Sequence, residues 1–248
     1  MPNLHTRNPL RLPGVESYFD LKRPEIVLAL QANRTQGKRI IEIGCGGAAT
    51  SAAVKNALNA DYYVGIEVNE QAAERARAQI DKVIVADLNK SSSQDLGIAA
   101  DDFDLLLALD VLEHLYNPWD VLADWARVLR PGGRVMVSIP NMQNIELVAA
   151  LAHGQFQYDS AGLRDATHIR FFTEASAIDL VQGAGLVVVA IDRVLSETIK
   201  MDQVRATNNS VSAGKLTISG LDRGEVTALN VWQFLITGQR PLTSAAAL

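Results

Sequence analysis

The feature that most constrains this chain is an apolar run that ends in a glycine turn. Residues 38–49 read Lys-Arg-Ile-Ile-Glu-Ile-Gly-Cys-Gly-Gly-Ala-Ala, which predicts a strand, a turn and the start of a helix. Gly44, Gly46 and Ala49 fit the spacing G-x-G-x-x-[G/A]. In that pattern a nucleotide cofactor lies against the turn and the N-terminus of the helix. The spacing alone would suit NAD or FAD, so it predicts a cofactor site without choosing the cofactor.

An acidic residue inside this strand narrows the choice of cofactor. Glu42 stands two positions before Gly44, and a dinucleotide would bring its pyrophosphate close to that carboxylate. In a poorly screened site the two negative charges repel each other. S-adenosylmethionine carries a sulfonium, an ammonium and no phosphate, so its charges suit Glu42. The turn therefore favours S-adenosylmethionine, and an NAD(P)-dependent oxidoreductase is the alternative.

Acidic residues also follow the next three predicted strands. The second strand ends at Glu67, which lies 21 residues after Gly46, where a ribose-binding carboxylate is expected in either cofactor class. The third and fourth strands lead to Asp87 and Asp110. Parallel strands bring their carboxyl ends to one edge of a sheet, and ligands bind at that edge in open α/β folds. These acids are therefore expected around one site.

Taken in order, these motifs resemble those of the class I S-adenosylmethionine-dependent methyltransferases. The resemblance covers residues 38–140, and the flanking segments 23–26 and 167–173 are similar to a bacterial subset associated with methylation of saccharides and other small hydroxyl compounds. The residues that carry it are 41–47, 65–67, 86–87, 103–114 and 129–133, which read IEIGCGG, GIE, AD, FDLLLALDVLEH and LRPGG. The resemblance implies an enzyme that moves the methyl group of S-adenosylmethionine to a nucleophile, here expected to be a hydroxyl oxygen.

The same resemblance implies the fold. We expect one Rossmann-like α/β domain over residues 1–248, with a seven-stranded, mostly parallel sheet, helices on both faces and an antiparallel last strand. The expected parts are a leading helical segment at 14–35 and a cofactor-binding core at 38–140. An acceptor-side cap or loop at 141–173 and a C-terminal helix with strands at 174–240 follow. A polar insertion at 196–224 is long enough for a flexible loop or an added hairpin.

Local patterns predict the limits of individual elements. Helices are predicted at 17–33, 47–58, 70–79, 118–129, 144–152 and 174–183, and strands after the first at 61–67, 82–86, 103–109, 134–139, 186–194 and 226–237. Asn69 and Asn117 are natural N-caps, and Pro118 suits the first position of a helix. Pro24 either bends the first helix or starts a second one. This leading helical segment could close over the cofactor, or it could simply cover a sheet edge.

The predicted cofactor contacts come from the turn and the strand ends. The full set is Glu42, Gly44, Cys45, Gly46, Glu67, Val68, Asp87, Leu88, Leu109, Asp110 and His114. The resemblance places Asp87 beside the adenine, whose exocyclic amine needs an acceptor. Asp110 and His114 flank the site, although the pair could instead form a hydrogen bond that stabilises the loop. Cys45 is expected to pack as a small side chain and not to act as a nucleophile.

A histidine after the fifth strand is the candidate catalytic base. An alcohol must lose its proton as it attacks a methyl group, and histidine is the side chain best suited to accept a proton at neutral pH. His168 lies in a polar loop expected to face the acceptor, and Asp165 could orient its ring if the segment forms a turn. The alternative is that His168 anchors the loop through a backbone carbonyl.

No metal site is expected. Glu113 and His114 are adjacent, have no third marked ligand nearby, and would diverge on a helix or strand. A catalytically silent module that only binds the cofactor remains a second alternative to an enzyme.

Composition limits the partners. The net charge is −5, so no overall positive field would draw the chain to nucleic acid or to an anionic membrane. Residues 1–13 lack the apolar core of a signal peptide, and no apolar stretch approaches the length of a membrane span. A single cysteine excludes an intrachain disulfide. We therefore expect a cytoplasmic protein that acts on a small-molecule acceptor.

Overall fold

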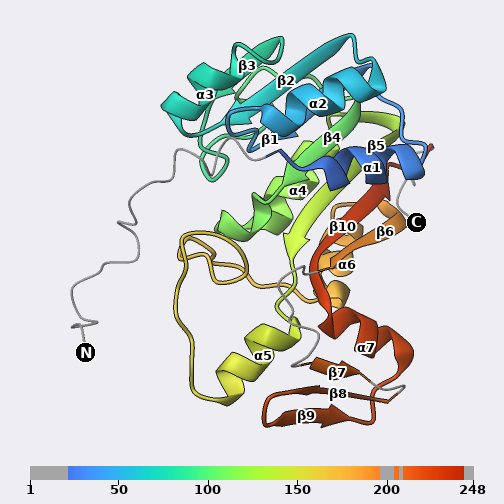
Figure 1. The fold of residues 1–248 in the computed structure, drawn as a ribbon. Coiled ribbons are helices and arrows are strands. Elements are labelled where there is room, and N and C mark those ends of the chain that lie inside the picture. Colours follow the sequence, from blue (N-terminus) through green and yellow to red (C-terminus); the bar gives the residue numbers. More distant parts are fainter. Residues whose placement is uncertain (1–21, 196–203, 207–208, 243–248) are drawn as a thin grey trace.

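The centre of the molecule is a seven-stranded sheet with the order β3-β2-β1-β4-β5-β10-β6 (Figure 1). The computed structural model describes residues 22–195, 204–206 and 209–242. Strand β10 is antiparallel to both of its neighbours, and the strands from β3 to β5 pair in parallel. The predicted sheet, with its antiparallel last strand, is therefore confirmed. The strands are β1 Arg39–Ile43, β2 Tyr62–Glu67, β3 Lys82–Val85, β4 Phe103–Leu109, β5 Leu129–Pro140, β6 Val187–Leu195 and β10 Val231–Gln239.

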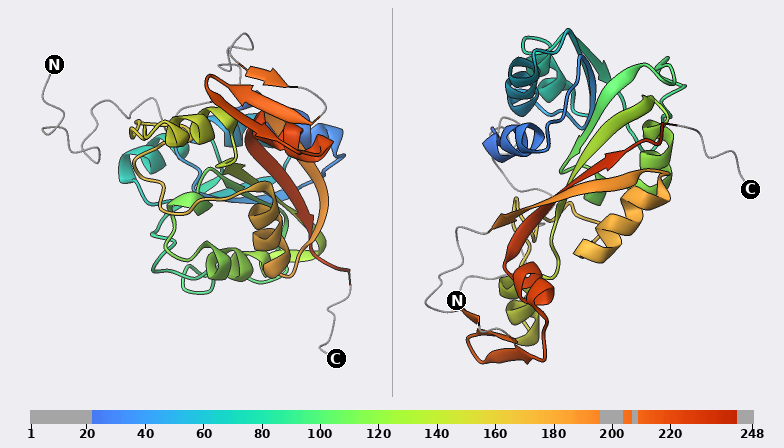
Figure 2. Two further views of the ribbon diagram at one scale, coloured as in Figure 1. Left: turned by 90° about the horizontal axis from the view of Figure 1, so that it is seen from below. Right: turned by 90° about the vertical axis from the view of Figure 1, so that its right-hand side faces the viewer.

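Helices cover both faces of this sheet because alternate strand residues are apolar on both sides. One face packs α1 Pro24–Ala32, α2 Ala49–Leu58 and α3 Glu70–Ala76 against residues such as Ile40 and Leu105. The other face packs α4 Pro118–Ala126 and α6 Glu174–Gly183 against the next residues along the strands, Ile41 and Leu106. Figure 2 shows these layers from two further directions. The carboxyl edge of the parallel strands stays uncovered by the helix layers.

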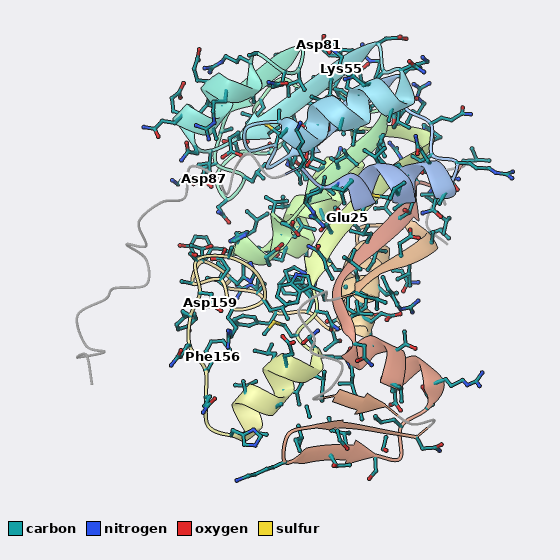
Figure 3. All side chains as sticks on the ribbon, viewed as in Figure 1. Glu25, Lys55, Asp81, Asp87, Phe156 and Asp159 are labelled. Carbon is teal, nitrogen blue, oxygen red and sulfur yellow. The ribbon has the colours of Figure 1, made fainter. Side chains whose placement is uncertain are left out.

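The predicted cap residues act as expected. The Asn69 side chain accepts a hydrogen bond from Ala72 N–H, and the Asn117 side chain accepts one from Asp120 N–H directly before Pro118. Helix α3 ends at Ala76, three residues earlier than predicted, and a turn follows it. An ion pair of 2.6 Å between Lys55 and Asp81 joins α2 to the residue directly before β3 (Figure 3).

Two strand limits differ from the prediction. Strand β5 begins at Leu129, because the Pro-Gly-Gly segment does not end the pairing: Gly132 N–H donates to the Arg240 carbonyl and Arg240 N–H donates to the Gly133 carbonyl. The predicted start of the last strand at residue 226 is wrong. Those residues belong to helix α7 Arg223–Leu229, whose capping box joins Asp222 and Glu225 reciprocally.

The insertion forms a small sheet of its own. Strands β7 Val204–Ala206, β8 Ser210–Ala213 and β9 Leu216–Ser219 pair in antiparallel order. Ile145, Val211 and Leu229 form a second apolar core between this sheet, α5 Ile145–Ala152 and α7, which together make the lower lobe of Figure 1. Residues 196–203 and 207–208 of the insertion, and residues 14–21 of the leading segment, lie outside the described residues. Within the described part, Pro24 starts helix α1.

Candidate functional site

A cavity of about 590 Å³ opens at the carboxyl edge of the parallel strands. All twelve predicted site residues line it, from Glu42 on β1 to His168 in the loop before α6. The structure thus brings together residues that the sequence separates by more than a hundred positions. Their individual roles toward a cofactor stay predictions.

The glycine turn after β1 uses its own amide groups internally. Gly44 N–H and Cys45 N–H both donate to the Ile66 carbonyl, at 2.8 and 3.1 Å, and Gly46 N–H donates to the Glu67 carboxylate at 2.8 Å. Gly44 has a φ of +75°, and a Cβ there would lie 2.7 Å from Val111. The turn therefore requires glycine at this position and offers no amide from these three residues to a phosphate.

Two acids lie under and beside this turn. Glu67 is buried, and its two oxygens accept hydrogen bonds from the Gly46 and Asn69 amides. Glu42 is also buried, and its Oε2 accepts hydrogen bonds of 2.5 Å from Ser51 and from Tyr63. Burial raises the pKa of Glu42 to about 7, against the opposing effect of these two hydroxyl donors. Glu42 is therefore close to half ionised at neutral pH.

Cys45 packs inside the turn. Its side chain is buried, and a Cβ on Gly65 of β2 would lie 2.5 Å from its sulfur. Burial, with the nearby Glu42, raises the pKa of the Cys45 thiol far above its usual range. These contacts are those of a packed, protonated side chain, as the sequence predicts.

The side chain of Asp110 ties three elements together. Its carboxylate accepts hydrogen bonds from Ser138 and Gln233 and forms an ion pair with Arg23, the N-cap residue of α1. Asp110 has a φ of +51°, a left-handed conformation that Asp tolerates better than most residues. His114 does not bond to it and instead contacts Thr167, so the predicted alternative of an Asp110–His114 hydrogen bond is not seen. Sequence reasoning missed Gln233, although a polar residue inside the apolar strand β10 was a signal.

The ends of β2 and β3 contribute Val68, Asp87 and Leu88 to the cavity, where the sequence predicts the nucleoside. Val68 is exposed there and Leu88 is buried. Asp87 accepts a hydrogen bond from Asn89 N–H and pairs with Lys90 Nζ at 2.9 Å (Figure 3). The hydrogen bond from Lys90 is the main cause that lowers the pKa of Asp87. An ionised acceptor therefore stands where the adenine amine is expected.

His168, Thr167, Gly162 and Trp232 also line the cavity. Burial, followed by the neighbouring His114, lowers the pKa of His168 to about 4. Asp165 does not orient this ring through a hydrogen bond as predicted. Its carboxylate accepts instead from the amide and hydroxyl of Thr167, at 2.8 and 2.6 Å.

The reasoning against a metal ligand set is wrong on one point. Glu113 and His114 do have a third potential ligand, since His168 comes within reach of both from a loop 54 residues away in sequence. The short 3₁₀ turn Leu112–His114 keeps the adjacent side chains of Glu113 and His114 from diverging as they would on a strand. The spacing of these three residues along the sequence does not predict that His168 comes close to Glu113 and His114.

Comparison with protein families identifies the core of the chain. Residues 41–137 match the family model described as a methyltransferase domain. This match agrees with the S-adenosylmethionine-dependent methyltransferase part of the sequence resemblance. The resemblance to a saccharide-associated subset gains no support from the match.

Curated relatives agree with this family. A ubiquinone biosynthesis O-methyltransferase of Hahella chejuensis is 28% identical over 155 residues, which are 62% of this chain and 58% of that protein. One of Aromatoleum aromaticum is 30% identical over 56% of this chain and 53% of that protein. The chain therefore spans little more than half the length of these two relatives.

Solved structures share the fold. An S-adenosylmethionine-dependent methyltransferase of Archaeoglobus fulgidus superposes with a TM-score of 0.61 at 13% identity and covers 91% of this chain and 97% of its own. One of Mesorhizobium loti gives a TM-score of 0.55 at 18% identity, over 86% of this chain and 96% of its own. Among the described residues of the chain, no helix combines the length and apolar character needed to cross a bilayer. The cytoplasmic location stays a prediction.

Proposed function

We propose that this chain transfers the sulfonium methyl group of S-adenosylmethionine to a hydroxyl oxygen of a small acceptor. The observation that carries the proposal is the glycine turn: the amides of Gly44, Cys45 and Gly46 are already bonded, and the acids Glu42 and Glu67 stand next to them. A phosphate would find neither free donors nor a positive charge in these residues. A cationic cofactor with ribose hydroxyls would find two acceptors.

This arrangement argues against a nicotinamide oxidoreductase, which needs turn amides for its pyrophosphate. Binding of NADH in place of S-adenosylmethionine would overturn the proposal. A module that binds the cofactor without turning it over is the remaining alternative, and only a turnover assay separates it from an enzyme.

The reaction itself asks little of the protein beyond alignment. The acceptor oxygen attacks the methyl carbon in line with the carbon–sulfur bond, the electron pair of that bond passes to sulfur, and S-adenosylhomocysteine leaves. Because the donor is already activated, holding the two reactants in line supplies much of the rate. We assign His168 the promotion of proton loss from the acceptor hydroxyl, since it lines the cavity. The sequence predicts His168 as the catalytic base and residues 141–173 as the acceptor side of the site.

For the acceptor we propose a small hydroxyl compound such as a saccharide. Support for oxygen as the methylated atom comes from relatives named ubiquinone biosynthesis O-methyltransferases. The aromatic face of Trp232, which lines the cavity, suits the ring of such an acceptor.

The test is a screen for S-adenosylhomocysteine release over sugars, nucleotide sugars, catechols and other phenols, and small acids. We expect release with a hydroxyl acceptor, and a fall of roughly 10²-fold or more in kcat for His168→Ala with nearly unchanged cofactor affinity. His153→Ala is the matched control, because His153 is exposed at the end of α5 and does not line the cavity. Cofactor binding without release over the whole panel would favour the silent module.

A further inference from the structure

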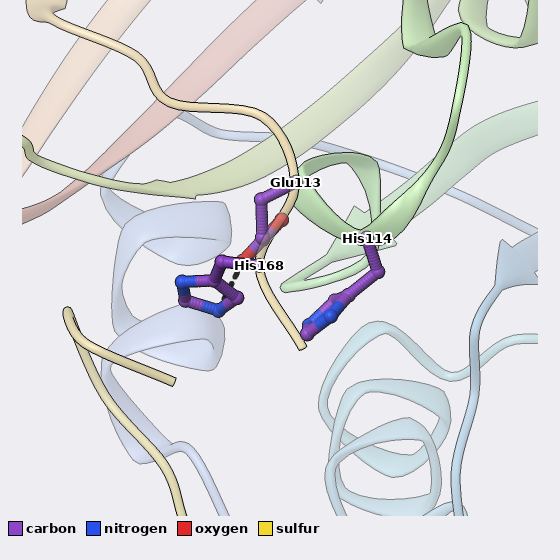
Figure 4. Close-up of side chains that lie close together, drawn as sticks. All are labelled: Glu113, His114 and His168. Atoms are coloured by element: carbon purple, nitrogen blue, oxygen red, sulfur yellow. Dashed lines mark ion pairs between the residues drawn. The ribbon is translucent and has the colours of Figure 1, made fainter. Parts of the chain in front are cut away.

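Three side chains converge at the acceptor end of the cavity. Glu113, His114 and His168 each present one potential ligand atom, and these atoms lie within 4.8 Å of one another (Figure 4). Glu113 Oε1 lies 3.9 Å from His168 Nε2. All three residues line the cavity described above. Two histidines and one carboxylate form a donor set that divalent transition metals use widely.

Glu113 is the residue that most needs a partner. Its side chain is 1% exposed, and both of its oxygens are buried without a hydrogen bond in the described structure. A buried carboxylate that is neither paired nor hydrogen-bonded is costly, so it takes up a proton or a cation. The charged groups that act on Glu113 are the acids Asp110 and Asp165, which favour a bound proton or cation, and Arg23, which opposes them.

The two histidines are oriented as metal ligands are. His114 Nδ1 lies 3.2 Å from the Thr167 carbonyl and 3.0 Å from the Thr167 hydroxyl. A metal-bound histidine commonly donates its second ring N–H to a backbone carbonyl, which fixes the tautomer and turns the other nitrogen toward the ion. The His114 ring already has that backbone contact, and His168 Nε2 faces Glu113. The pair of rings meets edge to face, with centroids 4.8 Å apart.

We propose that Glu113, His114 and His168 bind a divalent first-row transition metal ion such as Zn²⁺. Zinc bonds of about 2.0–2.1 Å place the ligands of a tetrahedron about 3.4 Å apart. The 3.9 Å between Glu113 and His168 is close to that value, and small side-chain rotations bring in His114. Mg²⁺ fits less well, because it prefers oxygen ligands in an octahedron. Since three protein ligands leave a zinc coordination position open, the ion faces the cavity with one place for a further ligand.

This site deepens the proposed function, on which its role in catalysis rests. The acceptor hydroxyl takes the open position, and the ion lowers the pKa of that hydroxyl, so its proton passes to water. The resulting alkoxide or phenoxide oxygen bonds to the methyl carbon while the carbon–sulfur bond breaks toward sulfur. The metal keeps its oxidation state throughout. His168 then promotes proton loss as a ligand of the ion and not as the base that the sequence predicts.

The test measures metal binding apart from catalysis. Full-length protein stripped with a chelator is titrated with Co²⁺, and binding is followed by calorimetry and by the visible d–d absorption of the ion. We expect one Co²⁺ per chain in the wild type and in His153→Ala, the control histidine outside the site. Glu113→Gln, His114→Ala and His168→Ala should each weaken binding by about 100-fold or more, beyond the 10–100-fold that a lost outer partner costs. Circular dichroism checks the fold of each variant. If an alanine variant does not fold, the isosteric Glu113→Gln variant carries the test.

Each outcome is decisive. No stoichiometric Co²⁺ binding in the wild type, or equal binding in folded Glu113→Gln, overturns the site. S-adenosylmethionine is titrated into the same samples with and without Co²⁺. Equal methyl transfer by the metal-free and the metal-loaded protein overturns the role of the ion and leaves the proposed function standing. Co²⁺ bound at the three residues, with no S-adenosylmethionine bound under either condition, supports the metal site and refutes the proposed function.

Discussion

The Gly46 amide donates a hydrogen bond of 2.8 Å to Oε2 of Glu67, which joins the glycine turn after β1 to the end of β2. Oε1 of the same carboxylate accepts from the Asn69 amide, also at 2.8 Å. A carboxylate has about four lone-pair sites, so two such bonds leave acceptor capacity toward the cavity. Glu67 is therefore held in place before any ligand arrives, and it can bind the two hydroxyls of a ribose without further ordering.

Replacing Glu67 with Gln should weaken S-adenosylmethionine binding by about 1–3 kcal/mol, because it removes a charged acceptor from the ribose hydroxyls. Isothermal titration calorimetry gives the dissociation constant. Glu70→Gln is the matched control, since Glu70 is an exposed acid three residues further along the chain. An unchanged dissociation constant in a folded Glu67→Gln protein would show that this residue only ends the strand.

The second prediction concerns pH and stability. The pKa of Glu42 is about 7 in the folded chain, against an ordinary value of 4.5. Between these values the folded state binds more protons than the unfolded state, so the stability that Glu42 contributes falls as pH rises from about 4.5 to 7. The full loss is at most about 3 kcal/mol. Glu42→Gln cannot ionise, so its stability relative to the wild type should rise across that interval.

Urea unfolding at pH 5, 6, 7 and 8 measures this difference. Glu70→Gln again serves as the control and should follow the wild type at every pH. Parallel profiles for the wild type and Glu42→Gln would mean that Glu42 keeps an ordinary pKa in the folded chain.

The third prediction links the same residue to the cofactor. A sulfonium and an ammonium near Glu42 favour its ionised form and lower its pKa. Binding of S-adenosylmethionine at pH 7 should therefore release a fraction of a proton, and affinity should rise as pH increases through 7. Calorimetry in two buffers of different ionisation enthalpy detects the proton. Identical heats in both buffers, or proton release retained in Glu42→Gln, would contradict the linkage.

Much of the fold follows from local sequence signals. The apolar strands alternate with helices whose starts are marked by Asn69, Asn117 and Pro118, and these signals are local, so the structure keeps them. Predictions of element limits were wrong where those limits depend on tertiary contacts. The Pro-Gly-Gly segment reads as a stop, yet it pairs with residue Arg240 at the far end of the chain. Residues 226–229 read as a strand, yet the Asp222 capping box and the small second core hold them in a helix.

The site divides in the same way. The part of the cavity at the strand ends was predictable because its residues follow strand ends, which a parallel sheet always gathers at one edge. The part around His168 depends on how the loop 153–172 returns to the cavity, and no spacing rule sets that path. The hydrogen bonds of the Ile169 and Arg170 amides to the Glu113 carbonyl fix this path, and they bring His168 beside Glu113. The Asp165 carboxylate bonds Thr167 and not the His168 ring.

The last prediction tests the acceptor end through Trp232 on β10. Trp232 lines the cavity, and its indole packs so closely on the loop that a Cβ on Gly162 would lie 3.0 Å from Cζ2. Trp232→Phe should widen this end and change kcat/KM for the acceptor by about tenfold, in the range that altered pocket contacts produce. The dissociation constant of S-adenosylmethionine should not change, because Trp232 lies away from the glycine turn. Trp119→Phe is the matched control: Trp119 is about half exposed beside Phe172 and does not line the cavity. A Trp232→Phe protein with altered cofactor affinity and unaltered acceptor kinetics would place this tryptophan in the cofactor site and move the acceptor elsewhere.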